Sequence, residues 1–185
     1  MILSFRSSSE FRKWLAANHD KSDGIWLRIL KKNSDTASIT YAEALDEAIC
    51  FGWIDGQKQK HDARSWLQKF TRRRAKSGWS RINTGHAERL MREGRMKPSG
   101  QAEVDAAKKD GRWKAAYDSP SNAAIPDDFL AALSKDAKAK AFFDSLNKAN
   151  LYAISYRLQT AKKAETRQRR MEMILGMLAR GEAFH

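Results

Sequence analysis

The chain has 185 residues, of which 42% are hydrophobic and 31% are charged, and it contains six tryptophans. This length suits one domain with at most a small appendage, and the aromatic content excludes a mainly disordered chain. The formal net charge of +13 favours an anionic partner, because like charges gathered on one surface attract anions.

The single cysteine, Cys50, excludes an intramolecular disulfide and a zinc site built from several cysteines. We expect a buried, inert thiol, because no histidine stands at a spacing typical of a catalytic pair. No metal-ligand motif is present, so we expect no metal and no cofactor. The first residues do not resemble a signal peptide, and no apolar run approaches the roughly 20 residues of a membrane span. We therefore expect a cytoplasmic protein.

The first predicted elements are a helix and a strand. Ser7 and Glu10 have the spacing of a capping box, so a short helix should follow and end near Asn18. Residues 24–31 are rich in β-branched and aromatic side chains, and their apolar positions alternate. That pattern predicts a strand with one buried face.

A second helix and a hairpin come next. Thr40 and Glu43 form another capping box, and Gly52 suits the left-handed residue that closes a helix. Two alternating runs, 53–60 and 64–71, flank a short polar turn, which predicts a β-hairpin. Together with the first strand, this hairpin predicts a small antiparallel sheet of about three strands.

The rest of the chain has helical patterning. One predicted helix ends at Gly94 and another covers residues 99–109, while residues 118–122 are the best linker candidate. Strands with helices thus precede a segment of helices alone. This order predicts an α+β fold, with an α+β domain over residues 1–118 and an all-helical C-terminal unit over 119–185.

The positive charge is concentrated in two stretches. From Gln57 to Arg95 there are 12 Lys or Arg residues against 3 acidic ones, and residues 161–170 contain 5 against 1. The differences, 9 and 4, account for the whole net charge of +13. Such clustering favours a binding surface for anions, although it also fits a solubility device spread over several faces.

Five phrases in the sequence resemble a known family. They read CFGWIDG (50–56), FTRRRAKSGWSRIN (70–83), GRMKPSG (94–100), DGRWKAAY (110–117) and AKKAETRQRR (161–170). In this order they resemble the YdeI/OmpD-associated family, whose label is bacteriocin protection, from Trp26 to Gly181. The chain departs from the family at Arg72, where the family usually has Pro, and at Ala164, where it often has Pro. The resemblance implies no established reaction and no agreed catalytic residues.

The basic middle segment carries the main candidate site. Forked guanidinium groups bind phosphate and aromatic faces stack on bases, so a surface with both suits nucleic acid. The aromatic residues of this segment are Trp66, Phe70 and Trp79. The candidate anion-binding or nucleic-acid-binding residues are Arg72, Arg73, Arg74, Lys76, Arg81, Trp79, Ser80 and Asn83. Alternatively, the aromatic residues face the core, and Ser80 caps a helix.

Trp53 and Asp55 share one face of a predicted strand, which makes a pocket holding both conceivable. Asp55 would serve there as a general base or a ligand-orienting group, or it would bond neighbouring backbone amides or an arginine.

From these features we expect a non-catalytic protein that binds an anionic partner, with nucleic acid first and a phosphorylated small molecule or an acidic protein surface second. One alternative is an enzyme with a cleft around Trp53, Asp55, Arg74 and Ser80. A further alternative is a role in antimicrobial-peptide or stress resistance through a partner protein. The net charge of +13 would repel cationic peptides, which disfavours their direct sequestration.

Overall fold

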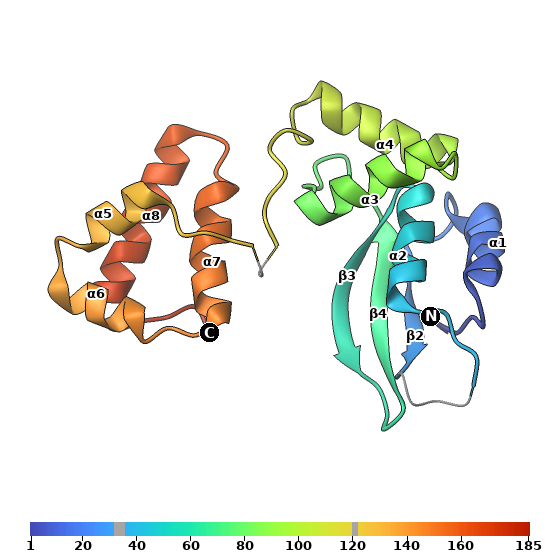
Figure 1. The fold of residues 1–185 in the computed structure, drawn as a ribbon, viewed down its shortest axis with the longest axis horizontal. Helices are drawn as coiled ribbons and strands as arrows, with labels where there is room; N and C mark the ends of the chain where they lie inside the picture. Colours follow the sequence, from blue (N-terminus) through green and yellow to red (C-terminus); the bar gives the residue numbers. More distant parts are fainter. Residues whose placement is uncertain (32–35, 120–121) are drawn as a thin grey trace. The chain divides into compact units, whose positions relative to one another are not determined.

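The computed structural model describes residues 1–31, 36–119 and 122–185, and its contacts divide the chain into two compact units. Unit 1 comprises residues 1–79 and 83–114, and unit 2 comprises residues 80–82 and 115–185. The described residues form eight helices and one four-stranded sheet, which confirms the α+β class (Figure 1). The predicted division into domains 1–118 and 119–185 stays a prediction. The predicted linker includes residues 120–121, which lie outside the described ones.

The sheet belongs to unit 1 and has the strand order β1-β2-β4-β3. Its strands are β1 (Ile2–Leu3), β2 (Gly24–Leu30), β3 (Trp53–Lys60) and β4 (Ser65–Arg72). The pairs β2–β4 and β3–β4 are antiparallel, as expected, but β1 adds a parallel pair with β2. The expectation of about three antiparallel strands is therefore corrected to a mixed sheet of four. A two-residue strand is too short to show any alternation in the sequence.

Four helices accompany the sheet in chain order: α1 (Ser8–Asn18), α2 (Tyr41–Cys50), α3 (Arg81–Arg92) and α4 (Pro98–Lys109). The hydroxyls of Ser7 and Thr40 accept hydrogen bonds from the amides of Glu10 and Glu43, so both predicted N-caps are confirmed. Gly52, just after α2, has a φ of +75°, the left-handed conformation expected there.

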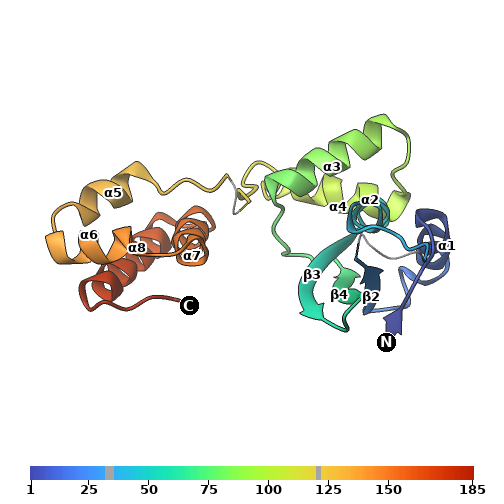
Figure 2. The same ribbon diagram turned by 60° about the horizontal axis from the view of Figure 1, so that its bottom comes forward.

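The helices α1 and α2 pack on one face of the sheet and bury its apolar side (Figures 1 and 2). Ile25, Leu27 and Ile29 alternate along β2 as fully buried residues. The Phe11 ring of α1 lies 5.9 Å from the Phe70 ring of β4, which ties the helix layer to the centre of the sheet. Outside this core, residues 56–64 around the turn of the β3–β4 hairpin are exposed.

The start of α4 lies directly against the end of α2. The amide of Lys97 donates to the carbonyl oxygen of Cys50 at 3.0 Å, and Gly100 sits where a Cβ atom would overlap that same oxygen. Only a residue without a side chain fits this close approach of two backbones.

Unit 2 contains four further helices: α5 (Asp127–Leu133), α6 (Ala137–Asp144), α7 (Lys148–Gln159) and α8 (Ala164–Ala179). They enclose a separate apolar core centred on Phe129, Leu133, Ile154 and Ile174. The predicted all-helical C-terminal part is thereby confirmed for the described residues of this unit.

Candidate anion-binding site

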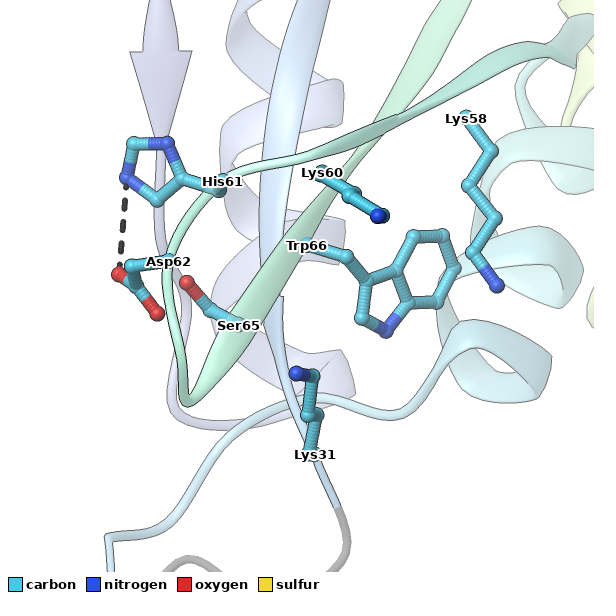
Figure 3. Close-up of a pocket in the computed structure, with 7 residues that line it drawn as sticks. All are labelled: Lys31, Lys58, Lys60, His61, Asp62, Ser65 and Trp66. Carbon is cyan, nitrogen blue, oxygen red and sulfur yellow. Dashed lines mark ion pairs between the residues drawn. The ribbon is translucent and has the colours of Figure 1, made fainter.

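A pocket of about 670 Å³ opens beside the end of the β3–β4 hairpin (Figure 3). Its lining comes from the residue after β2, from both hairpin strands and from the turn that joins them. The lining residues are Lys31, Lys58, Lys60, His61, Asp62, Ser65 and Trp66. In Figure 3 the three lysine side chains lie around the indole of Trp66. The pocket therefore combines several cations with one aromatic ring.

A bulge in β3 determines which side chains face Trp66. Asp55 pairs with Phe70 and Lys58 pairs with Gln68, so β3 has one more residue than β4 between these pairs. The extra residue reverses the alternation, because successive side chains point to opposite faces of a strand. Beyond the bulge Lys60 lies opposite Trp66, on its face of the sheet.

The indole of Trp66 is half-buried and has two neighbours of different chemistry. The Lys58 ammonium lies 4.3 Å from the indole centroid, which is cation–π geometry. The Tyr41 ring lies 6.0 Å away and is tilted by 45°. The ring is therefore positioned by the sheet and by α2, while the exposed Lys58 covers part of its π surface.

The acid of the pocket, Asp62, already has its own partners. Its carboxylate accepts hydrogen bonds from the Arg28 guanidinium at 2.9 Å and from the Arg64 amide at 2.8 Å. A hydrogen bond from Ser65, followed by the Arg64 amide and the charge of Arg28, lowers the pKa of Asp62 to about 2. Since Arg28 balances this carboxylate, Asp62 does not offset the lysine charges.

The three lysines of the pocket gather positive charge beside Trp66. Lys31 donates to the carbonyl oxygen of Ala63 at 2.9 Å, a neutral partner that holds its ammonium in place. Within the described residues, neither Lys31 nor Lys58 nor Lys60 forms an ion pair. Anions are attracted to such a cluster of like charges.

The arginine run of the sequence is divided between core and surface. Arg73 is only 6% exposed, and its guanidinium stacks 3.5 Å from the centroid of the Trp79 ring, which is itself 1% exposed. Arg73 also donates to the carbonyl oxygen of Gly78 at 3.1 Å, and Arg72 donates to that of Asp20 at 3.1 Å. Arg73 and Trp79 therefore hold the segment after β4 in place.

The remaining predicted basic residues lie on the surface. Arg74 and Lys76 are exposed, and the backbone amide of Arg74 donates to the Ser77 hydroxyl at 3.0 Å. Ser80 and Arg81 belong to unit 2, where Arg81 pairs with Asp118 at 2.8 Å and Ser80 forms an isolated bridge with Tyr117. Within unit 1, the predicted residues Arg73 and Trp79 are therefore buried, whereas Arg72, Arg74 and Lys76 are exposed.

Asp55 sits in a small hydrogen-bonded cluster close to the pocket. Its carboxylate accepts from the Tyr41 hydroxyl at 2.8 Å and from the Asn83 amide at 3.4 Å. Burial, reinforced by the charge of Asp55, raises the pKa of Tyr41, so the phenol remains a donor. Trp53 is fully buried, and its indole N–H donates to the His19 carbonyl oxygen at 3.0 Å. Trp53 therefore belongs to the core.

Cys50 is the one thiol of the chain. Cys50 is buried, and burial raises the pKa of its thiol. No group of three or more His, Cys, Asp or Glu side chains is arranged there to hold a metal ion. Nor does any helix of this part of the chain combine the length and the apolarity needed to cross a membrane.

Two family models match the chain, one mainly over unit 1 and the other within unit 2. Residues 3–103 match the model described as "Domain of unknown function (DUF8412)", which covers more than half of the chain. The chain belongs to the DUF8412 family. Residues 122–181 match the model described as "Bacteriocin-protection, YdeI or OmpD-Associated", which confirms the resemblance for this part. Comparison with curated proteins and with solved structures gave no significant match.

Every residue that lines the pocket lies inside the DUF8412 match. Trp66 stands out in the sequence among the aromatic residues of the basic segment, whereas Lys31, Lys58 and Lys60 are not among the predicted site residues. One signal for the two β3 lysines was available in the sequence. Gly56 interrupts a strand pattern, which suggests a bulge and so a change of face for the residues that follow.

The second basic stretch, residues 161–170, lies within the YdeI/OmpD-associated match. Arg167 forms a two-pronged pair with Asp128, with one contact at 2.8 Å, and Arg170 donates to the Arg157 carbonyl oxygen at 2.7 Å. Part of this charge therefore stabilises the packing of helices inside unit 2.

Proposed function

We propose that this DUF8412 protein is a non-catalytic binding protein whose β3–β4 hairpin binds an anionic partner, with nucleic acid as the first candidate. One observation carries the proposal: Lys31, Lys58 and Lys60 converge on a single pocket and have no acidic partner among the described residues. Bringing like charges together costs electrostatic energy, which a bound anion removes.

The surroundings of the pocket favour a partner with many negative charges. Residues 57–76 contain 8 Lys or Arg against the single acid Asp62. Of these, Arg64, Arg74 and Lys76 are exposed beyond the pocket itself. A polyanion contacts several such residues at once and releases a counterion from each phosphate, so it gains more than a singly charged ligand does.

The non-catalytic part of the proposal rests on how the candidate enzyme residues are engaged. Asp55 is held between Tyr41 and Asn83, and Trp53 is enclosed in the core. The Asp55 carboxylate, the candidate general base, is thus engaged by two protein donors, and Trp53 lies in the core instead of lining a cleft.

The test is a titration of a fluorescently labelled single-stranded oligonucleotide of about 12 nucleotides, followed by anisotropy at several salt concentrations. We expect binding at low salt whose logarithmic affinity falls linearly with the logarithm of salt, by about 0.7 for each phosphate contact. The variant Lys31→Ala/Lys58→Ala/Lys60→Ala should bind more weakly and show a shallower salt slope.

The matched control is Lys13→Ala/Lys21→Ala/Lys109→Ala, which removes the same charge from exposed positions of unit 1 outside the pocket. This control should keep most of the affinity. Absence of binding at low salt, or an equal loss in both triple variants, would refute the proposal.

A further inference from the structure

We infer that the lysine pocket is a nucleotide subsite, which stacks one unpaired base on Trp66 and holds the adjoining phosphate with Lys31 and Lys60. The inference rests on the proposed function and narrows it to single-stranded nucleic acid.

The Trp66 ring is positioned by its own strand, β4, and by Tyr41 of α2. Trp66 lies in β4, and several buried residues of this strand hold it in the sheet. The neighbouring Tyr41 donates a hydrogen bond from its hydroxyl to Asp55. The indole is half-buried, so it keeps an exposed part at the pocket. An immobilised, partly exposed indole loses little conformational freedom when a base stacks on it.

Lys58 occupies the position that a base would take. Its ammonium lies 4.3 Å from the Trp66 centroid, but the side chain is exposed and its stem is flexible. A cation–π contact at an exposed site is weak, and it is replaced when a planar π system stacks on the same ring. The released ammonium then remains beside the ligand, where it can meet a phosphate.

Lys31 and Lys60 provide the phosphate contacts. The Lys31 ammonium is fixed by the Ala63 carbonyl oxygen, whereas Lys60 projects from β3 opposite Trp66. Both ammonium groups lie beside the indole in Figure 3. Ammonium groups bind phosphate as point charges, without a demand for one fixed geometry.

This combination selects among anionic partners. Inorganic phosphate, polyphosphate and acidic peptides use only the lysines, because they offer no planar ring for Trp66. Bases in a duplex already stack on their neighbours, so they also leave Trp66 unused. Only a nucleotide or an unpaired base in a single strand engages the ring and the charges together.

The experiment compares two oligonucleotides with equal numbers of phosphates, one with all its bases and one fully abasic. At fixed low salt we expect the protein to bind the base-bearing strand about tenfold more tightly. Trp66→Ala should abolish this preference while leaving the affinity for the abasic strand unchanged, and Trp66→Phe should retain most of the preference.

The two β3 lysines give a second, independent readout. Lys60→Ala should weaken the binding of both strands by the same factor, because it removes only a phosphate contact. Lys58→Ala should weaken the binding of the abasic strand more than that of the base-bearing strand. The reason is that the variant also removes the ammonium that competes with a base for the Trp66 ring. A thermal melt followed by circular dichroism shows whether Trp66→Ala folds. If it does not, the contrast between the two lysine variants can still be measured.

The outcomes separate the inference from the function on which it rests. Equal affinity for both strands, or an equal loss on both in Trp66→Ala, overturns the nucleotide subsite while leaving anion binding by the hairpin intact. If neither strand binds at low salt, both proposals fail.

Discussion

The side-chain amide of Gln68 donates to the backbone carbonyl oxygen of Gly56 at 2.8 Å, inside the bulge of β3. Gln68 is buried, and the same amide reaches the Gln57 carbonyl oxygen at 3.3 Å. A bulge leaves backbone groups without their ladder partners, and a buried amide satisfies them here. This polar core residue therefore sustains the irregularity that turns Lys58 and Lys60 toward Trp66.

We predict that Gln68→Leu destabilises the protein by about 1–3 kcal/mol, because it leaves a carbonyl oxygen of the bulge without its donor. The free energy of unfolding from urea denaturation measures the effect. The control Gln59→Leu changes an exposed residue of the same hairpin and should stay within about 0.5 kcal/mol of the wild type. Equal stability of the two variants would contradict a role of Gln68 in stabilising the bulge.

Gly100→Ala should cost several kcal/mol or prevent folding, on the order of the largest single-residue effects. The new Cβ would overlap the Cys50 carbonyl oxygen, and neither of the two backbones can move freely. Gly85→Ala is the matched control, because nothing lies within 4 Å of its Cβ position in α3. That variant should gain about 0.5–1 kcal/mol from helix propensity. Thermal melts of both proteins test the pair.

Glu47 joins two arginines from distant segments of unit 1. Its carboxylate is 5% exposed and contacts Arg12 at 2.6 Å and Arg95 at 2.8 Å. Glu47→Gln keeps the shape but removes the counter-charge of Arg12 and the nearest of the carboxylates around Arg95, so we expect a loss of about 3 kcal/mol in urea unfolding. Glu93→Gln removes a carboxylate that is 39% exposed and should change stability by less than about 1 kcal/mol. Similar losses in the two variants would contradict this account.

The depressed pKa of Asp62 gives a prediction for acid conditions. Its pKa falls from the ordinary 3.8 to about 2, so the ionised form is favoured in the folded state. This contribution to stability is present above about pH 4 and is lost as the pH falls toward 2. The difference in unfolding free energy between wild type and Asp62→Asn should therefore be constant above about pH 4 and shrink below it. A difference that is unchanged down to about pH 2 would be inconsistent with this role.

Local signals in the sequence were enough to predict much of the fold. The capping residues Ser7 and Thr40 and the left-handed Gly52 each act within a few residues of their own position, and the structure agrees with all three. The strand Ile2–Leu3 was missed because it depends on a partner, Trp26, that is distant in the sequence.

The candidate site was less predictable, for two physical reasons. The charges of a segment can be counted from its sequence, but the burial of its side chains cannot. The sequence therefore does not show that Arg73 stacks on Trp79 in the core. The pocket also depends on the register of β3 against β4. Simple alternation from Asp55 puts Gln57 and Gln59 on the Trp66 face, and only the bulge replaces them with lysines.

The same bulge lies in the outermost strand of the sheet as it is described, since β3 pairs only with β4. An outer strand exposes backbone donors and acceptors that a strand of another molecule can adopt, which is a route to aggregation. Irregular backbone and lysine side chains both discourage such pairing. Lys58 and Lys60 therefore disfavour pairing of β3 with a strand of another molecule, whether or not a ligand is bound. Their removal should lower the solubility of the protein at high concentration.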